Sequence, residues 1–435
     1  MSKDNISLDM TSVKDLYSAA FGDLPIADVS CHLSSKEIAS GKKFSNASEL
    51  LIYNSRRIQC TMRMCGVDEK YITGCGSDFE KFRELCRIMP TLFENTIHTS
   101  IHNVLRRYLS CDLILNPQNC EKIWEITSEA LSLNEFNVAD ILKAENVSLL
   151  FTKENFGEDI SSLSQIDCLI PNTTVLPLLS ADSIISINQK GIENVIEKLE
   201  KSTSIKISDL DSLYSALTIQ MDAFAKHGAR AVYHNLSNFK AFSRPDKYHS
   251  NEIFKHAFFK DGDDISDAQM LTWQAQSLRF FGIECKKRNL ALIIDLGDNV
   301  NTYALTSLFD YLSNENALNK VLLIPHTPID LLITAELCGR YPQNDNRERS
   351  TVSCAIGEDF VGTELDIISS LIPLGRTVCS ASCLSQEQYR LELCRMAINM
   401  SDGHCDQDSA EIIKMISNAA YFNTINYFAV DNAEK

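Results

Sequence analysis

The chain of 435 residues contains no apolar run of the about 18 residues needed to cross a bilayer. Its first residues, MSKDNISLDMTSVKDL, are polar and include no apolar segment of the kind found in secretory signals. Lys and Arg are outnumbered by Asp and Glu, 41 to 58, which gives a net charge of −17. Binding a phosphate backbone requires a basic face. We therefore expect a cytoplasmic protein that engages neither membranes nor nucleic acid.

The sequence also lacks any C-x-x-C pair, although it contains 15 cysteines. Cys379 and Cys383 are four residues apart, but no second pair or nearby His completes a zinc-binding pattern. An odd number of cysteines without a secretory signal predicts reduced, mostly buried thiols. No internal repeat or low-complexity tract is present, so a repeat architecture is excluded.

Eight short β-rich or apolar segments of strand length alternate with amphipathic helical patterns. These segments are IADVSCHL (26–33), VSLLFT (147–152), TVLPLLS (174–180), ARAVYHN (229–235), LALIIDLG (290–297), KVLLIPH (320–326), TVSCAI (351–356) and RTVCSA (376–381). Helical periodicity is clear at 210–226 and 267–286. This alternation predicts an α/β fold, a (β/α)8 TIM-type barrel whose chemistry lies at the carboxyl ends of its strands. A two-domain α/β architecture remains an alternative.

The segment 34–146 is too long for one crossover and contains helical patterns at about 45–65, 77–88, 95–109, 118–131 and 136–144. We interpret it as an all-helical insertion laid over the barrel mouth. The predicted organisation is thus an N-terminal segment with the first strand (1–33), the insertion (34–146), the rest of the barrel with C-terminal helices (147–428) and a frayed tail (429–435).

Four strings along the chain carry a resemblance to a known family. DVSCHL (28–33) with KEIA (36–39) resembles D-Y-H-C-H-L-x-x-K-E-I-A, and residues 62–74 resemble M-R-x-x-G-V-D-E-x-Y-I-T-G. A Trp-Glu pair at 124–125 and YFNTINYF (421–428) extend the match to nearly the whole chain. On these strings the chain resembles the uronate isomerases (glucuronate or galacturonate isomerases) of the amidohydrolase superfamily.

The resemblance implies an aldose–ketose isomerisation of D-glucuronate to D-fructuronate, and of D-galacturonate to D-tagaturonate, in uronate catabolism. It also implies a bound divalent metal, Zn or Mn, that holds the sugar oxygens. The expected partner is a small-molecule sugar acid, and a homo-oligomer is left open.

The metal-binding motif of the family is only half matched. Two imidazoles at i and i+2 on a strand point to the same side and can hold one metal ion. Here the first falls at Ser30 and only His32 is retained. The last strand should end in T-D-S-R, yet no Asp or Glu occurs between Asp366 and Glu387. His32 is therefore a metal-ligand candidate with an incomplete set, or a core histidine.

The remaining candidates lie at the other strand ends. RAVYH (230–234) matches R-x-S-D-H with Tyr233 in place of the acid, which leaves Arg230 for substrate binding and His234 as a base or a satisfied polar group. LSAD (179–182) retains Asp182 of F-R-P-D as a second substrate-binding candidate, and we suggest that it pairs with Arg230, since a buried charge needs a partner. IIDLG (293–297) places Asp295 where the family has His, as a catalytic group or a ligand.

Two functions of different classes follow from this pattern. The first is a divergent uronate isomerase in which His234 and Asp295 carry the proton transfer. A reduced metal site of His32, Asp182, His234 and Asp295 is a related hypothesis. The second is a catalytically inactive relative, a pseudoenzyme that keeps the barrel to bind a sugar acid or a protein.

Overall fold

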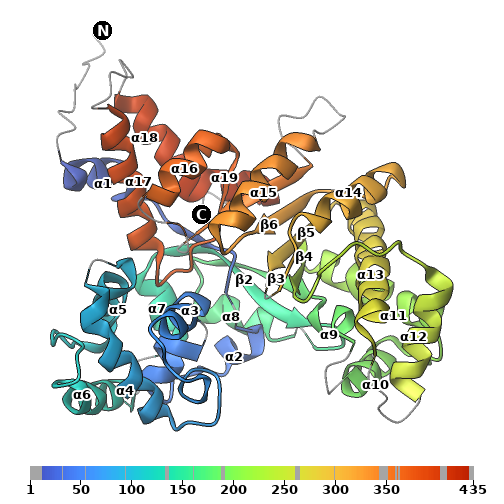
Figure 1. Cartoon of the computed structure of the whole chain (residues 1–435), viewed down its shortest axis with the longest axis horizontal. Coiled ribbons are helices and arrows are strands. Elements are labelled where there is room, and N and C mark those ends of the chain that lie inside the picture. The colour runs from blue at the N-terminus through green and yellow to red at the C-terminus, as the bar shows by residue number, and fades with distance from the viewer. Residues whose placement is uncertain are drawn as a thin grey trace.

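The computed structural model describes residues 12–430 except 32, 54, 94, 133–136, 160, 188–191, 260–264, 298, 342–350, 358–359, 361–362 and 402–408. At its centre eight parallel strands pair in the order of the sequence and form a nearly closed (β/α)8 barrel, as the alternation predicts (Figure 1). The strands are β1 (Ile26–Asp28), β2 (Val147–Asn155), β3 (Thr174–Ser180), β4 (Ala231–Leu236), β5 (Ala291–Leu296), β6 (Val321–Ile324), β7 (Val352–Ile356) and β8 (Val378–Cys379).

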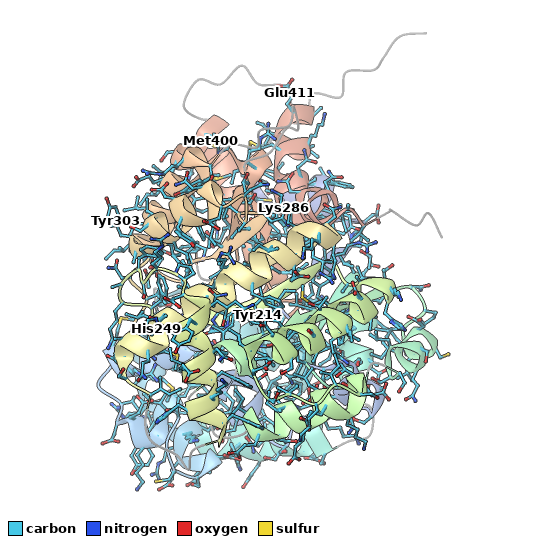
Figure 2. The ribbon with its side chains drawn as sticks, turned by 90° about the vertical axis from the view of Figure 1, so that its right-hand side faces the viewer. Tyr214, His249, Lys286, Tyr303, Met400 and Glu411 are labelled. Carbon is cyan, nitrogen blue, oxygen red and sulfur yellow. The ribbon has the colours of Figure 1, made fainter. Side chains whose placement is uncertain are left out.

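Helices follow each strand from β2 onward and form the outer layer, part of which faces the viewer in Figure 2, where Tyr214 marks α11 and Lys286 marks α13. They are α8 (Leu163–Leu169), α9 (Asp182–Ile185), α10 (Ile192–Thr203), α11 (Leu210–Lys226), α12 (Lys247–Phe259), α13 (Asp267–Arg288), α14 (Ala304–Asn314), α15 (Pro328–Arg340), α16 (Thr363–Leu371), η4 (Leu374–Arg376), α17 (Gln386–Ser401), α18 (Ser409–Ser417), η5 (Asn418–Phe422) and α19 (Asn423–Phe428). Within the described residues, no helix has the length and apolar character needed to cross a membrane.

The two helices with clear periodicity begin and end where local chemistry dictates. Asp209 precedes α11 and Ser266 precedes α13, and each exchanges hydrogen bonds with the third residue of its helix in a capping box. Asn289 ends α13 in the left-handed conformation, which Asn tolerates better than most residues. These caps satisfy backbone groups that would otherwise lack partners.

The described residues between β1 and β2 are helical, and they gather at one side of the barrel, blue to cyan in Figure 1. They form α2 (Ser35–Ala39), η1 (Glu49–Tyr53), α3 (Arg56–Met64), η2 (Glu69–Tyr71), α4 (Asp78–Ile88), η3 (Met89–Leu92), α5 (Thr96–Leu109), α6 (Cys120–Ser132) and α7 (Val138–Ala144). A core of their own holds η1 to α6 together, with Phe82, Leu105 and Ile123 fully buried, while α2 and α7 pack in a cluster with β1 and β2. The polar N-terminal segment, in contrast, contains the unpredicted helix α1 (Val13–Phe21), which packs on α17 and α18.

Inward side chains fill the barrel, and the end of the chain closes its amino end. Leu149, Ala231 and Ile293 belong to one buried cluster with the aromatic residues of α19. The Phe151 and Phe428 rings lie 4.8 Å apart between centroids. Because the described residues fill the amino end in this way, the carboxyl ends of the strands are where a ligand is expected to enter.

The junction of β1 and β8 is held by side chains. No backbone ladder between these two strands is found among the described residues. Instead the Asp28 carboxylate accepts a hydrogen bond from the backbone N–H of Cys383 at 2.9 Å, and the Ser30 hydroxyl donates to the carbonyl oxygen of Ser380 at 2.8 Å. The position of the missing metal ligand, Ser30, therefore takes part in closing the barrel.

Candidate functional site

A cavity of about 760 Å³ lies between the carboxyl ends of the barrel strands and the insertion. Strand ends contribute Asp28, Lys153, Tyr233, Asn235, Asp295 and His326, and the insertion contributes Tyr53, Arg56, Arg57 and Gln59 together with apolar side chains of α5 and α7. Its size falls in the range of small-molecule sites. The insertion thus forms the cover of the barrel mouth.

Asp295, at the end of β5, is the centre of a hydrogen-bonded chain in this cavity. The Tyr233 hydroxyl donates to its Oδ2 at 2.7 Å, and Nε2 of His326 lies 2.6 Å from its Oδ1. Burial and the negative charges of Asp295 and Asp182 raise the pKa of Tyr233 well above its usual value, so the phenol keeps its proton. Because a carboxylate only accepts, Nε2 of His326 carries the shared proton.

Asp182, the first residue of α9, also reaches the cavity, but its partners differ from the expected one. Its Oδ2 lies 2.8 Å from Nζ of Lys153, and its Oδ1 accepts from Nδ1 of His234 (3.1 Å) and from the backbone N–H of Asn235 (2.6 Å). The suggested pairing of Asp182 with Arg230 is therefore wrong. A lysine on β2 and the histidine of β4 hold this carboxylate.

His234 lies behind its strand rather than in the cavity. Successive side chains of a strand point to opposite faces, and it is Tyr233 and Asn235 that line the cavity. His234 is fully buried between Val232 and Leu236, which pack into the cluster formed with the outer helices. Its Nδ1 contacts Asp182, and no partner for its Nε2 is found in the described part of the chain. The structure does not bring His234 to a ligand.

Two other candidates also lie away from the cavity or outside the description. Arg230 precedes β4, at the amino end of the barrel, where its guanidinium donates to the Gly228 carbonyl oxygen at 3.2 Å. His32 lies outside the described residues. Of the five candidates, the structure places Asp182 and Asp295 in the cavity.

Sequence reasoning missed four charged or polar groups of this site. His326 ends the sixth predicted segment, and Lys153 directly follows the second, so their positions next to strand ends were the available signal. Arg56 and Arg57 come from α3 of the insertion, and Arg56 donates to the carbonyl oxygen of Leu296 at 2.9 Å. No strand pattern could have indicated residues that reach the mouth from the insertion.

The described residues of the cavity do not fit a metal ion. No three His, Cys, Asp or Glu side chains come together among them. Both oxygens of Asp295 are hydrogen-bonded to Tyr233 and His326, and both oxygens of Asp28 accept backbone N–H groups, from Ser30 and from Cys383. The hypothesis of one metal site formed by His32, Asp182, His234 and Asp295 finds no support among the described residues, because His234 points behind the strand and Asp295 has other partners. His32 lies outside those residues.

The pairing of Asp182 predicts a pH-dependent stability. Burial opposes its ionisation, but the hydrogen bond from His234 and the charges of His234 and Lys153 hold the pKa of Asp182 well below its usual value. A carboxyl with a depressed folded-state pKa stabilises the fold above its unfolded-state pKa of about 4 and loses this contribution as pH falls further. We expect Asp182→Asn to cost about 2 kcal/mol at pH 7, since breaking a buried pair is costly.

Urea unfolding of the wild type and of Asp182→Asn between pH 7 and pH 2.5 measures the stability contributed by the ionised Asp182 carboxylate. The difference in unfolding free energy should be constant from pH 7 to about pH 5 and shrink below pH 4. A difference independent of pH over the whole range would show that the ionised carboxylate is not the stabilising group.

Comparisons with known proteins agree with this fold. A profile of the glucuronate isomerase family matches residues 1–304. The uronate isomerases of Oceanobacillus iheyensis and Clostridium perfringens are each 26% identical to this chain, over 98% of it and 97% and 99% of their own lengths. Two crystal structures share its fold. The Thermotoga maritima uronate isomerase matches with a TM-score of 0.75 and 19% identity, over 96% of this chain and 97% of that one. The Caulobacter crescentus glucuronate isomerase matches with a TM-score of 0.74 and 13% identity, over 96% of this chain and 94% of that one. With the family profile matching well over half of its length, this chain belongs to the glucuronate isomerase family.

Proposed function

We propose that the chain converts an aldose uronate into its keto isomer in the cytoplasm, taking D-glucuronate to D-fructuronate and D-galacturonate to D-tagaturonate. The observation that carries the proposal is the hydrogen-bonded chain of Tyr233, Asp295 and His326 in the barrel-mouth cavity. Family membership supports the substrate class. These three hydrogen-bonded side chains supply the acid–base group that a proton transfer between two carbons requires.

In the proposed reaction His326 takes the proton from C2 of the open-chain aldose. The C2–H electron pair forms the C1=C2 bond, and the π pair of C1=O1 moves onto O1 to give an enediolate. His326 then returns the proton to C1, while the proton of the C2 hydroxyl passes to O1 and leaves the C2 ketone. Asp295 fixes the tautomer of the neutral His326 ring and stabilises the imidazolium that forms, and Tyr233 fixes Asp295.

The sugar carboxylate is assigned to the arginines of α3. Guanidinium groups bind carboxylates in bidentate geometry, and Arg56 and Arg57 are the cations that the insertion adds to the cavity. They face the strand ends from the cover, so the carboxylate end of the sugar would lie toward the insertion and its C1 end toward Asp295 and His326. The net charge of −17 does not oppose this arrangement, because local arginines decide the binding of a small anion.

The test is detection of the keto-uronate by proton NMR after incubation of purified protein with D-glucuronate or D-galacturonate. Reactions run with EDTA, with added Zn²⁺ and with added Mn²⁺ test the metal that the family resemblance implies. Asp295→Asn protein purified in the same way controls for an isomerase carried over from the host. Product formed by the wild type at the rate of this variant would refute the proposal.

A second candidate function is binding of a sugar acid without turnover. It is favoured by one observation: among the described residues no three metal-binding side chains come together, so they do not form the metal site that the family resemblance implies. Calorimetric titration with D-glucuronate decides between the two candidates. Saturable binding without product, and without deuterium uptake at C2 in D₂O, would establish a binding protein in place of an enzyme.

A further inference from the structure

Lys153 is a partly buried cation of the cavity that the family motifs do not predict. It lies near the carboxyl end of β2, and its side chain lines the cavity. Its Nζ lies 2.8 Å from Oδ2 of Asp182 and 4.3 Å from the centroid of the Tyr233 ring. The side chain is 23% exposed, so the ammonium is largely shielded from water while it remains open to a ligand.

The partners of Lys153 are themselves fixed. Asp182 is held by the His234 ring and by the backbone N–H of Asn235, so the counter-ion of the lysine cannot rotate freely. Tyr233, whose ring lies under the ammonium, donates its hydroxyl proton to Asp295. One tyrosine side chain therefore connects the cation to the acid–base pair, and both face the same cavity.

We propose that the Lys153 ammonium stabilises the enediolate oxygen of the isomerisation, which makes the reaction independent of a metal ion. The inference rests on the proposed function and deepens it. In the step written above, negative charge develops on O1 when the C2–H pair forms the C1=C2 bond. Lys153 donates a hydrogen bond to that oxygen and keeps its own proton, so atoms and charges balance without a co-reactant.

Two observations favour Lys153 for this role. The described residues of the cavity offer no group of three metal-binding side chains, whereas Lys153 supplies a positive charge beside Tyr233. An ammonium already fixed by a carboxylate and an aromatic face needs little reorganisation when charge develops, and a partly desolvated site strengthens its effect. The competing explanation is that Lys153 only neutralises Asp182.

Lys153→Met and Lys153→Arg test the proposal in the NMR assay, with Lys206→Met as the control. Lys206 is an exposed lysine that pairs with Glu200 on the outer surface. We expect Lys153→Met to lower kcat by about 10²-fold, as loss of one oxyanion donor does, with KM changed less than about threefold. Lys153→Arg should restore part of kcat, Lys206→Met should match the wild type, and EDTA should leave the wild-type rate unchanged.

The outcomes separate this inference from the proposed function. A wild type without turnover would overturn both. An active wild type whose kcat is unchanged in Lys153→Met, or whose turnover is abolished by EDTA and restored by metal, would overturn only the inference. Circular dichroism melting identifies a variant that fails to fold. If Lys153→Met melts early, the folded Lys153→Arg variant decides. Its arginine neutralises Asp182 but places its N–H donors differently from the lysine. A wild-type kcat in this variant would therefore contradict a fixed oxyanion contact.

Discussion

Asp295→Asn is expected to lower kcat for D-glucuronate by about 10³-fold or more, with a small change in KM, because the carboxylate that orients a catalytic histidine has effects of this size. The asparagine preserves the shape of the side chain but loses the charge that stabilises the imidazolium of His326. Its amide nitrogen can also face Nε2 and impose the other tautomer. Initial rates of keto-uronate formation over a range of substrate concentrations give kcat and KM separately.

The matched control for this variant is Asp112→Asn, since Asp112 is an exposed carboxylate paired with Arg106 on the insertion. It removes the same charge far from the cavity and should leave kcat unchanged. Tyr233→Phe should have an intermediate effect of about tenfold, because it removes one hydrogen bond to Asp295 and leaves the charge. Full activity of Asp295→Asn would move the proton transfer to another group.

Trp273→Ala is expected to lower the free energy of unfolding by about 4 kcal/mol, the usual cost of removing a large buried aromatic side chain. Trp273 of α13 is fully buried, and its ring stacks on Phe254 of α12 with centroids 6.2 Å apart. Its Nε1 donates to the carbonyl oxygen of Ile184 at 3.0 Å. Ile184 lies in α9, the short helix that begins with Asp182, so the same tryptophan supports the site.

Urea unfolding followed by circular dichroism measures this loss. Trp273→Phe keeps most of the packing and loses the hydrogen bond, so it should cost about half as much. Tyr303→Ala, which truncates an aromatic ring that is 63% exposed at the start of α14, should change the stability by no more than about 0.5 kcal/mol. Equal losses in Trp273→Ala and Tyr303→Ala would show that burial in this core is not the cause.

The strands were the most predictable part of the fold. Seven of the eight predicted segments differ from the observed strands by at most a few residues at each end, because buried parallel strands appear as continuous apolar runs. The first is the exception: the segment 26–33 contains only the three-residue strand β1, and Ser30 beyond it bonds to Ser380 at the junction with β8. Helix α1 was not predicted, because it is short, begins within a polar stretch and packs against residues near the other end of the chain.

The site was less predictable than the fold because it depends on which face of a strand each residue occupies. Asp295 was found from its place at a strand end. At the end of β4 the sequence favoured His234 for its chemistry, but a shift of one residue exchanges the two faces of a strand, and Tyr233 occupies the inward position. Lys153 and His326 could not be recognised as site residues from the sequence, because their partners Asp182 and Asp295 are brought to them by other elements of the barrel.

The junction between β1 and β8 also has a consequence for the synthesis of the protein. Asp28 leaves the ribosome about 355 residues before its partner Cys383, and pairing of such distant segments is slow. No ladder between β1 and β8 is found among the described residues, so until the side chains of the junction meet, the edge of β1 is uncovered and can pair with another chain. We therefore expect closure of the barrel to be late, and a chain truncated before Cys383 to leave the edge of β1 open to other chains.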